Sequence, residues 1–399
     1  MGLEIRPVIP DEMDEFKRVA STALVMSAED FRWILPEWTL CAFEDGNLAT
    51  SYAAWQLTMR FNGKSMPVAG VTAVGTLPIY RRRGYLRQIT ENHFRLLKER
   101  GEQPVAALYA SRAAIYQRYG YAVVSTHNSY NIEPKYLDFP LAPPVTGSIR
   151  QVNDDDFELL VNLYKGFSDG RTGYIDRSRA LWDAAILNSP RSGGVLGKVI
   201  YEENGESLGY LIYTIEIFVG TNAIQIEQKL NIRDLVWYTP SAYQAIWNYI
   251  SNMDLVVSIV WGRVSSDDPL QHLLREPREL HVTAGDGLLA RIVDVEKALP
   301  GRHYLEEGRL TFEIMDDMCP WNQGRWKLET SAAGTSISHT SETPHLVMPV
   351  STLAMLLFGQ ISATEAARMG RLDALEYNTL PMWDRVMRTS FRPFCPDLF

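Results

Sequence analysis

The segment from Val71 to Gln88, VTAVGTLPIYRRRGYLRQ, joins a strand-like apolar stretch to a helix through a proline, three arginines and a glycine. A helix is predicted over residues 85–100, because its apolar residues fall on one arc at about 100° per residue. The first turn of a helix exposes N–H groups and partial positive charge, and Gly84 lets the backbone approach a ligand closely. The joint therefore predicts either a phosphate site or an exposed basic turn that caps a surface helix.

Strand and helix patterns alternate through the first 130 residues. A helix is expected over residues 10–20, two strands over 41–61 around an Asp-Gly-Asn turn, and another strand over 67–77. This mixed order predicts an α/β or α+β layer fold. His93 falls inside the apolar arc of the next helix, which indicates a packing role for its side chain.

The rest of the chain repeats and then changes this pattern. Four prolines in residues 131–148 mark a linker. The motif Ile-Arg-x-Val at 149–152 then repeats the one at 5–8, each followed by acidic residues and an amphipathic helix, as in an internal repeat. No second arginine turn follows.

After about residue 287, alternation at period two indicates a small sheet, and Ser362 with Glu365 has the spacing of a capping box. Three domains are expected, at 1–145, 146–286 and 287–399.

Several classes of function are disfavoured by what the sequence lacks. No Walker A lysine and no GxGxxG turn is present at the joint, which argues against a P-loop enzyme and a Rossmann dehydrogenase. The formal net charge is −9, whereas nucleic acid and anionic lipid surfaces require a basic protein. The start lacks the features of a signal peptide and no long apolar run occurs, so we expect a cytoplasmic protein without a membrane partner. The cysteines Cys41, Cys319 and Cys395 are scattered, so reduced structural thiols and no metal site are expected.

The joint also resembles a known family. VTAVGTLPIYRRRGYLR is similar to motif A of the GCN5-related N-acetyltransferases (GNAT), in which an R/Q-x-x-G-x-G/A turn holds the pyrophosphate of acetyl-CoA. The segment 104–122, PVAALYASRAAIYQRYGYA, resembles the strand, loop and helix that follow and carries the Y-x-R-x-G-Y signature. Together with DPLQHLL and DGLLARI further along, these motifs resemble the enhanced-intracellular-survival (Eis) subfamily. Leu86 stands where the general motif has Gly or Ala.

The resemblance implies tandem GNAT-like acetyltransferase domains, the first alone active, followed by an α+β domain similar to sterol carrier protein 2 (SCP2). It implies acetyl-CoA as co-substrate and a homo-oligomer, for which a hexamer is one expected form. By motif position the cofactor-binding residues are Val74, Gly75 and Thr76 at the strand end, Arg82, Arg83, Gly84, Tyr85, Leu86 and Arg87 around the pyrophosphate, and Ser111 and Arg112.

Two catalytic residues follow from the same resemblance. Tyr116 matches the tyrosine acid of the family, and a tyrosine hydroxyl, neutral at pH 7, is able to protonate a departing thiolate; a buried aromatic is the alternative. Phe399 matches the terminal phenylalanine whose α-carboxylate takes the proton from the amine. Its unperturbed pKa is about 3.5, so burial has to raise it. The alternatives are a tail that only docks in a groove and a charge supplied by Asp397.

The acceptor is an amine in this interpretation: a polyamine, an aminoglycoside-like molecule or a lysine side chain. Glu29, Asp30 and Glu37 beside Trp33 and Trp38 combine carboxylates and rings as a cation site does, although a solvated helix flank explains them too. Leu398 stands where the studied branch of the family has an acidic residue. A lipid or small-molecule carrier that senses acetyl-CoA without turnover is the alternative function.

Overall fold

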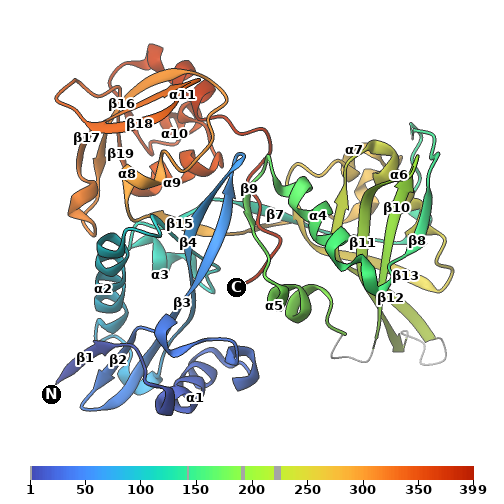
Figure 1. The fold of residues 1–399 in the computed structure, drawn as a ribbon, viewed down its shortest axis with the longest axis horizontal. Helices are drawn as coiled ribbons and strands as arrows, with labels where there is room; N and C mark the ends of the chain where they lie inside the picture. The colour runs from blue at the N-terminus through green and yellow to red at the C-terminus, as the bar shows by residue number, and fades with distance from the viewer. Residues whose placement is uncertain (1, 142, 190–193, 220–225) are drawn as a thin grey trace. The chain divides into compact units, whose positions relative to one another are not determined.

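The computed structural model describes residues 2–141, 143–189, 194–219 and 226–399. The chain divides into two compact units (Figure 1). The first unit contains Met1–Ser125, Gly287–Pro393 and Leu398–Phe399, and the second contains Thr126–Asp286 and Phe394–Asp397. Each unit is therefore assembled from segments that are distant in the sequence.

The first unit contains a mixed sheet in which β4 and β5 run parallel and the neighbouring pairs run antiparallel. In sheet order the strands are β1 (Leu3–Arg6), β2 (Cys41–Glu44), β3 (Asn47–Phe61), β4 (Lys64–Thr76), β5 (Val105–Leu108), β15 (Leu289–Ile292) and β6 (Ala122–Val123). Its helices are α1 (Met13–Leu24), α2 (Tyr85–Arg100), α3 (Ala113–Gln117) and α8 (Val295–Ala298). The expected helix over 85–100 and the expected strands on either side of the Asp-Gly-Asn turn are confirmed.

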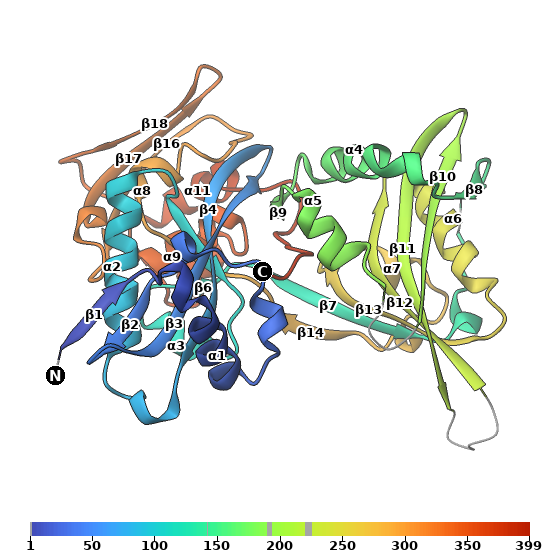
Figure 2. The same ribbon diagram turned by 60° about the horizontal axis from the view of Figure 1, so that its bottom comes forward.

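Helices α1 and α2 cover opposite faces of this sheet, as Figure 2 shows. Alternation along a strand explains this, because successive side chains point to opposite faces. Ala42 of β2 packs in the cluster with α2, whereas the next residue, Phe43, packs in the cluster with α1. We call these surfaces the α1 face and the α2 face. His93 of α2 is buried on the α2 face and bonds the Tyr52 hydroxyl at 2.7 Å, so its packing role is confirmed.

The second unit has a sheet of the same kind, with β12 and β13 as its parallel pair. In order its strands are β14 (Thr283–Asp286), β7 (Thr126–Ile132), β13 (Val256–Ser265), β12 (Ile226–Trp237), β11 (Glu206–Val219), β10 (Val195–Glu203) and β8 (Ser148–Gln151). Its other elements are α4 (Phe157–Ser168), β9 (Thr172–Ile175), α5 (Arg179–Leu181), α6 (Pro240–Ser251) and α7 (Leu270–Leu273). Helices α4 and α6 pack in separate core clusters of this unit.

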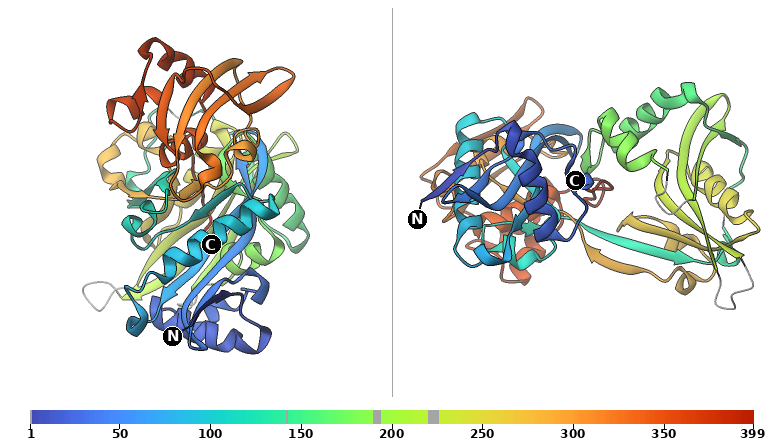
Figure 3. Two further views of the ribbon diagram at one scale, coloured as in Figure 1. Left: turned by 90° about the vertical axis from the view of Figure 1, so that its left-hand side faces the viewer. Right: turned by 90° about the horizontal axis from the view of Figure 1, so that it is seen from below.

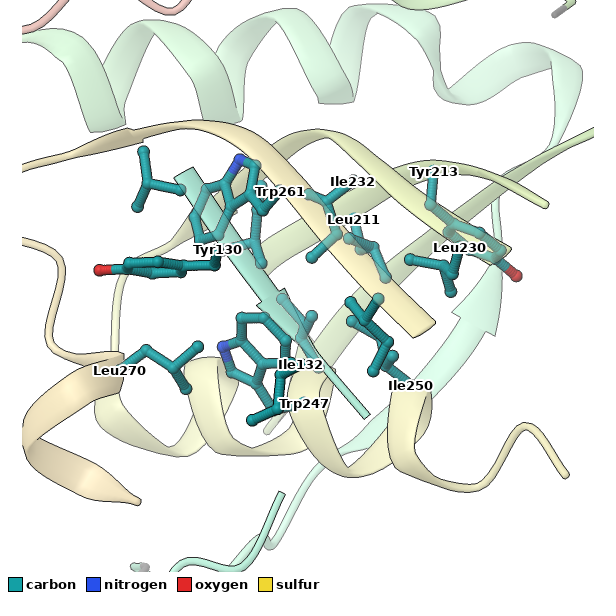
Figure 4. Packing of buried hydrophobic residues seen from close by; sticks show 14 of the residues in the cluster. Tyr130, Ile132, Leu211, Tyr213, Leu230, Ile232, Trp247, Ile250, Trp261 and Leu270 are labelled. Atoms are coloured by element: carbon teal, nitrogen blue, oxygen red, sulfur yellow. The ribbon is translucent and has the colours of Figure 1, made fainter. Parts of the chain in front are cut away.

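Each sheet includes one strand from the other half of the sequence. β15 directly follows β14 in the chain, yet it lies between β5 and β6 of the first sheet. Conversely, β7 directly follows β6 but lies between β13 and β14 of the second sheet (Figure 3). Tyr130 and Ile132 of β7 lie in the second core beside Trp247 and Trp261 (Figure 4). We call this arrangement the strand exchange.

The internal repeat predicted from Ile-Arg-x-Val is confirmed in structural detail. Both copies run from a strand through one turn of 3-10 helix, Pro10–Glu12 or Asp154–Asp156, into an amphipathic helix. In both, the arginine binds the carboxylate six residues later: Arg6 with Glu12 at 2.7 Å and Arg150 with Asp156 at 2.6 Å. The predicted first helix differs only in that its first residues, Pro10–Glu12, form this 3-10 turn and its end extends to Leu24.

The C-terminal part of the first unit is a small sheet with helices, as expected. The strands in order are β18 (Gly334–His339), β17 (Gly324–Ser331), β16 (Gly308–Met315), β19 (Leu346–Pro349) and β20 (Asp373–Ala374), and the helices are α9 (Val350–Phe358), α10 (Ala363–Arg368) and α11 (Leu380–Val386). The capping box is confirmed, since Ser362 Oγ accepts from the Glu365 N–H at 3.1 Å and the Glu365 carboxylate accepts from the Ser362 N–H at 2.7 Å.

Candidate active site

The predicted phosphate turn lies at the N-terminus of α2. Gly84 precedes the helix with φ of 83°, a left-handed conformation that suits glycine, and no neighbouring heavy atom lies within 4 Å of where its Cβ would stand. Among the residues that the structure describes, none accepts a hydrogen bond from the N–H groups of Tyr85, Leu86 or Arg87. The turn therefore presents unpaired donors and the positive end of the helix beside open space, which suits an anion.

The three arginines of the turn have different surroundings. Arg83 binds both oxygens of Glu44 at 2.6 Å, and Arg81 donates to the Thr76 carbonyl at 3.1 Å. Arg82 is exposed, has φ of 64°, and forms no ion pair within the described part of the chain. Of the three guanidinium groups, only that of Arg83 is thus paired with a carboxylate among the described residues. Arg87, one turn into the helix, pairs with Glu91 at 2.8 Å.

A β-bulge interrupts β4 just before the turn. Ala53 pairs with Thr72, but Ser51 pairs with Gly75, so β4 carries one extra residue there. Ala73 takes φ of 51°, and the Ser51 hydroxyl holds the bulge by donating to the carbonyl of Ala73 at 2.9 Å.

The bulge reverses the alternation of side chains along β4. Ala69 and Val71 pack on the α2 face, whereas Ala73 packs on the α1 face and Val74 on the α2 face. Gly75 is forced to be small, because a Cβ there would stand 2.7 Å from Cβ of Ala23 in α1.

Strands β4 and β5 pair over only three residues each. The parallel register joins Val68–Gly70 to Val105–Ala107, and β4 then continues to Thr76 without pairing to β5. The main chain of β4 between residues 71 and 76 is therefore not bonded to a strand on its β5 side. Such an edge is able to pair with an amide-bearing ligand in the manner of an added strand.

The loop after β5 and helix α3 hold the remaining cofactor candidates and Tyr116. Ser111 and Arg112 are exposed at the start of α3. Tyr116 is partly buried on the α2 face, with its ring 5.9 Å from that of Tyr121 in an edge-on contact. Burial raises the pKa of Tyr116 to about 12, so its hydroxyl stays protonated at any physiological pH.

Phe399 lies on the α1 face of the same sheet. Its ring is 5.4 Å from that of Tyr109, which follows β5, in an edge-on contact. It also covers Gly70 of β4, where an added Cβ would stand 3.0 Å from Cδ2 of Phe399 and 2.5 Å from Cδ1 of Leu57. The terminal phenylalanine is thus seated above the point at which β4 and β5 cease to pair.

Some of the acidic and aromatic residues after α1 already contact neighbouring groups of the protein. The guanidinium of Arg32 lies 5.0 Å from the Trp33 ring, and the Asp30 carboxylate accepts from the Ser27 N–H at 3.2 Å. Trp38 instead contacts Trp55 of β3, with ring centroids 5.2 Å apart. Because Trp55 is the register partner of Gly70, this pair belongs to the face that carries Phe399.

Asp397 is buried and paired with Arg177 at 2.8 Å in the second unit. Its carboxylate is therefore engaged by a guanidinium, and the alternative in which Asp397 replaces the terminal carboxylate stays a prediction.

Some site residues were not predicted from the sequence. Ser51 and Ala73 form the bulge. Neither TSYAA nor VTAVG predicts it from its own sequence, because a register shift depends on how two strands pair. Gly70 and Tyr109 seat Phe399. A glycine inside a strand does indicate close approach of another group, so Gly70 was open to prediction.

No group of three or more His, Cys, Asp or Glu side chains suited to a metal occurs among the described residues. The three cysteines are free and buried, as expected, and burial raises the pKa of Cys41 and of Cys319 to about 12. Within the same described ranges, no helix combines the length and hydropathy needed to cross a membrane.

Family models match most of the chain. An acetyltransferase (GNAT) domain model matches residues 4–124, a second acetyltransferase (GNAT) domain model matches residues 173–292, and a sterol carrier protein domain model matches residues 295–396. The expected fold class of tandem GNAT domains followed by an SCP2-like domain is thereby confirmed. GNAT acetyltransferases use acetyl-CoA as co-substrate.

Relatives extend the match to the whole chain. An uncharacterized N-acetyltransferase of Streptomyces avermitilis is 28% identical over 415 residues, covering 100% of this chain and 99% of that protein. N-acetyltransferase Eis of Mycobacterium tuberculosis is 27% identical over 322 residues, covering 77% and 74% of the two chains. Eis1 of Mycobacterium abscessus has a solved structure that matches with a TM-score of 0.84 at 26% identity, covering 100% of each chain. A GCN5-related N-acetyltransferase from Anabaena variabilis shares the fold, with a TM-score of 0.88, 22% identity and full coverage of both chains. The chain is an N-acetyltransferase with tandem GNAT domains, and it is similar to the Eis acetyltransferases.

Proposed function

We propose that this enzyme transfers the acetyl group of acetyl-CoA directly to an amine on a polyamine, an aminoglycoside-like molecule or a lysine side chain. The observation that carries the proposal is the set of unpaired N–H groups at Tyr85–Arg87, next to the unpaired edge of β4. The turn would bind the pyrophosphate of the substrate and the strand edge its pantetheine arm. Val74, Gly75 and Thr76 supply main-chain groups at the bulge, and Ser111 and Arg112 complete the binding surface at the start of α3.

The chemistry needs a proton acceptor, an oxyanion donor and a proton donor. In the proposed mechanism, the α-carboxylate of Phe399 takes the proton from the attacking amine, and the amine nitrogen forms a bond to the thioester carbonyl carbon. A main-chain N–H near Val74 stabilises the oxyanion. As the carbon–sulfur bond breaks, the Tyr116 hydroxyl gives its proton to the thiolate. The products are the acetamide and free coenzyme A.

The proposed acceptor site is the aromatic surface formed by Trp38, Trp55 and Phe399. Half-buried rings attract a cation through their negative faces, and Glu37 adds an acidic group next to Trp38. The amines that this site would accept are cations at neutral pH, as polyamines, aminoglycosides and lysine side chains are. An acetyl-transfer assay with polyamines, aminoglycosides and lysine peptides tests this choice, and turnover with none of them at any concentration contradicts it.

Replacing Arg82 by alanine is expected to raise the Kd for acetyl-CoA about tenfold, because one charge-assisted phosphate contact is worth about 1.5 kcal/mol. The effect should shrink as salt is raised, since an exposed charge is screened. Calorimetric titration of the free enzyme measures it. Arg95→Ala, which removes an exposed arginine from the same helix, is the control and should leave Kd unchanged; equal Kd values for the two variants would argue against the phosphate assignment.

Tyr116→Phe is expected to lower kcat about 100-fold, as loss of a general acid does, with little change in the Kd for acetyl-CoA. Because burial raises the pKa of Tyr116 to about 12, the neutral form persists over a wider range, so kcat should show no Tyr116-dependent loss up to about pH 10. Tyr119→Phe removes a hydroxyl three residues away and serves as control. Binding of acetyl-CoA by a parent enzyme that shows no turnover would instead favour the carrier or sensor function.

We further propose the domain limits 1–145, 146–286 and 287–399 as the evolutionary units of the chain. The family models support this division, since each of their matches falls within one of these three ranges or ends close to its limit.

A further inference from the structure

A buried ionic cluster in the second unit holds the chain two residues before its end. Arg177, between β9 and α5, has a fully buried side chain. Its Nε donates to the carboxylate of Asp397 at 2.8 Å, and its Nη1 donates to that of Asp234 on β12 at 2.5 Å. The side chain of Asp397 is fully buried as well.

Two tyrosines complete the cluster. The Tyr164 hydroxyl lies 3.3 Å from the Asp397 carboxylate, and the Tyr210 hydroxyl donates to Asp234 at 2.6 Å. The guanidinium of Arg177 also lies 3.8 Å from the Tyr164 ring. Asp397 is thus held chiefly by the short, charge-assisted hydrogen bond from Arg177 Nε, because the single proton of the Tyr164 hydroxyl also faces the Ile175 carbonyl at 3.0 Å.

The preceding residues are held in the same unit. The Phe394 N–H donates to the Thr172 carbonyl at 2.9 Å, and the Phe394 ring is 5.9 Å from that of Tyr174. The carbonyl of Cys395 accepts from Arg263 at 3.0 Å. By contrast, Leu398 is 60% exposed, so among the described residues the restraints on this end of the chain are the hold on Asp397 and the contacts of the Phe399 ring with Tyr109 and Gly70.

Stability alone is a poor explanation for this cluster. A buried ion pair contributes little net stability compared with apolar residues of similar volume, because its charges lose their hydration. What the cluster provides is a defined position for Asp397. We propose that Arg177 is a positioning residue for acetyl transfer: by binding Asp397 it sets the place of the Phe399 carboxylate. This inference rests on the proposed role of that carboxylate as the base.

Asp397→Asn is the suitable test variant. It removes the charge that Arg177 holds, while Asp234 remains to neutralise the guanidinium, so the fold should persist. Removing Arg177 itself would bury two carboxylates without a partner and endanger folding. Asp183→Asn is the matched control, because Asp183 pairs with Arg179 on the surface of the neighbouring turn, with about half of its side chain exposed.

The decisive measurement combines Asp397→Asn with one glycine added after Phe399. Asp397→Asn alone should lower kcat at least about tenfold, as a misplaced catalytic group does, with the KM for acetyl-CoA unchanged. In the extended chain, whose base is already displaced, the same substitution should lower kcat no further. The proposal would be overturned if the losses in kcat caused by Asp397→Asn and by the added glycine multiplied in the combined variant. It would also be overturned if Asp397→Asn alone kept full activity. Asp183→Asn should match the parent in both backgrounds.

A second measurement does not depend on activity. Carboxypeptidase A releases a terminal phenylalanine only when the tail leaves its seat, so Asp397→Asn should release Phe399 at least about tenfold faster than the parent or Asp183→Asn. Equal release rates would overturn the positioning role. If instead the glycine-extended enzyme kept full activity while Asp397→Asn released Phe399 faster, the terminal base would fail and the hold on the tail would stand.

Discussion

Adding a single glycine after Phe399 is expected to lower kcat about 100-fold, the effect of losing a general base, while the Kd for acetyl-CoA changes less than about twofold. The extension moves the charge by one residue and replaces the α-carboxylate of Phe399 by a neutral amide, which is not a base. The extension changes no residue of the phosphate turn or of β4. Steady-state kinetics with a saturating amine, together with titration of acetyl-CoA, measure the two effects.

A control separates the charge from the length of the tail. Phe399→Leu keeps the terminal carboxylate and a bulky apolar side chain over Gly70, so it should retain most of the activity that the extended chain loses. Gly70→Ala changes the β4 side of the same contact, because its Cβ would stand 3.0 Å from the Phe399 ring and 2.5 Å from the flexible end of the Leu57 side chain. An extended enzyme with parental kcat would exclude the terminal carboxylate as the base.

A fragment of residues 1–145 is expected not to fold cooperatively, although it contains the matched region of the first GNAT model. It lacks β15, whose Leu289 and Ile292 are fully buried between β5 and β6. Burial of the two side chains is worth about 4 kcal/mol, and the lost ladder bonds add to this, against a total stability of about 5–15 kcal/mol. The fragment also carries β7 without its sheet. Far-UV circular dichroism during urea unfolding should show no sigmoidal transition.

The matched control is a chain in which residues 1–125 are joined to residues 287–393. Gly287 donates its N–H to the Ser125 carbonyl at 2.9 Å, so a short glycine-rich turn is long enough to connect them. This joined chain restores β15 between β5 and β6 and should unfold cooperatively. A cooperative transition in the 1–145 fragment, at the urea midpoint of the joined chain, would contradict the requirement for β15.

Local features of this protein could be predicted from the sequence. The helix over 85–100, the strands around the Asp-Gly-Asn turn and the capping box at Ser362 depend on periodicity and on residues a few positions apart. The joint at Gly84 was accessible for the same reason, since strand, turn and helix are contiguous.

Features that join distant segments could not be predicted. The strand exchange places β15 beside β5, although about 180 residues separate them. The apolar pattern of β15 is equally compatible with a place in the first sheet or in the second. The ion pair of Arg83 with Glu44, 39 residues earlier, also had no signal in the local sequence. Likewise, the partner of Asp397 lies 220 residues before it, and neither residue carries a local signal.

The matching bridges of Arg6 with Glu12 and of Arg150 with Asp156, within two matched GNAT regions, are what duplication of one ancestral domain would produce. After duplication, a copy relieved of coenzyme recognition can diverge at positions that its twin must keep. In this enzyme the second copy, whose sequence carries no arginine turn, supplies Arg177, which binds Asp397. Duplication thus supplies a second copy of the fold whose residues are available for tasks other than coenzyme binding, and the ion pair with Asp397 near the end of the chain is one such task.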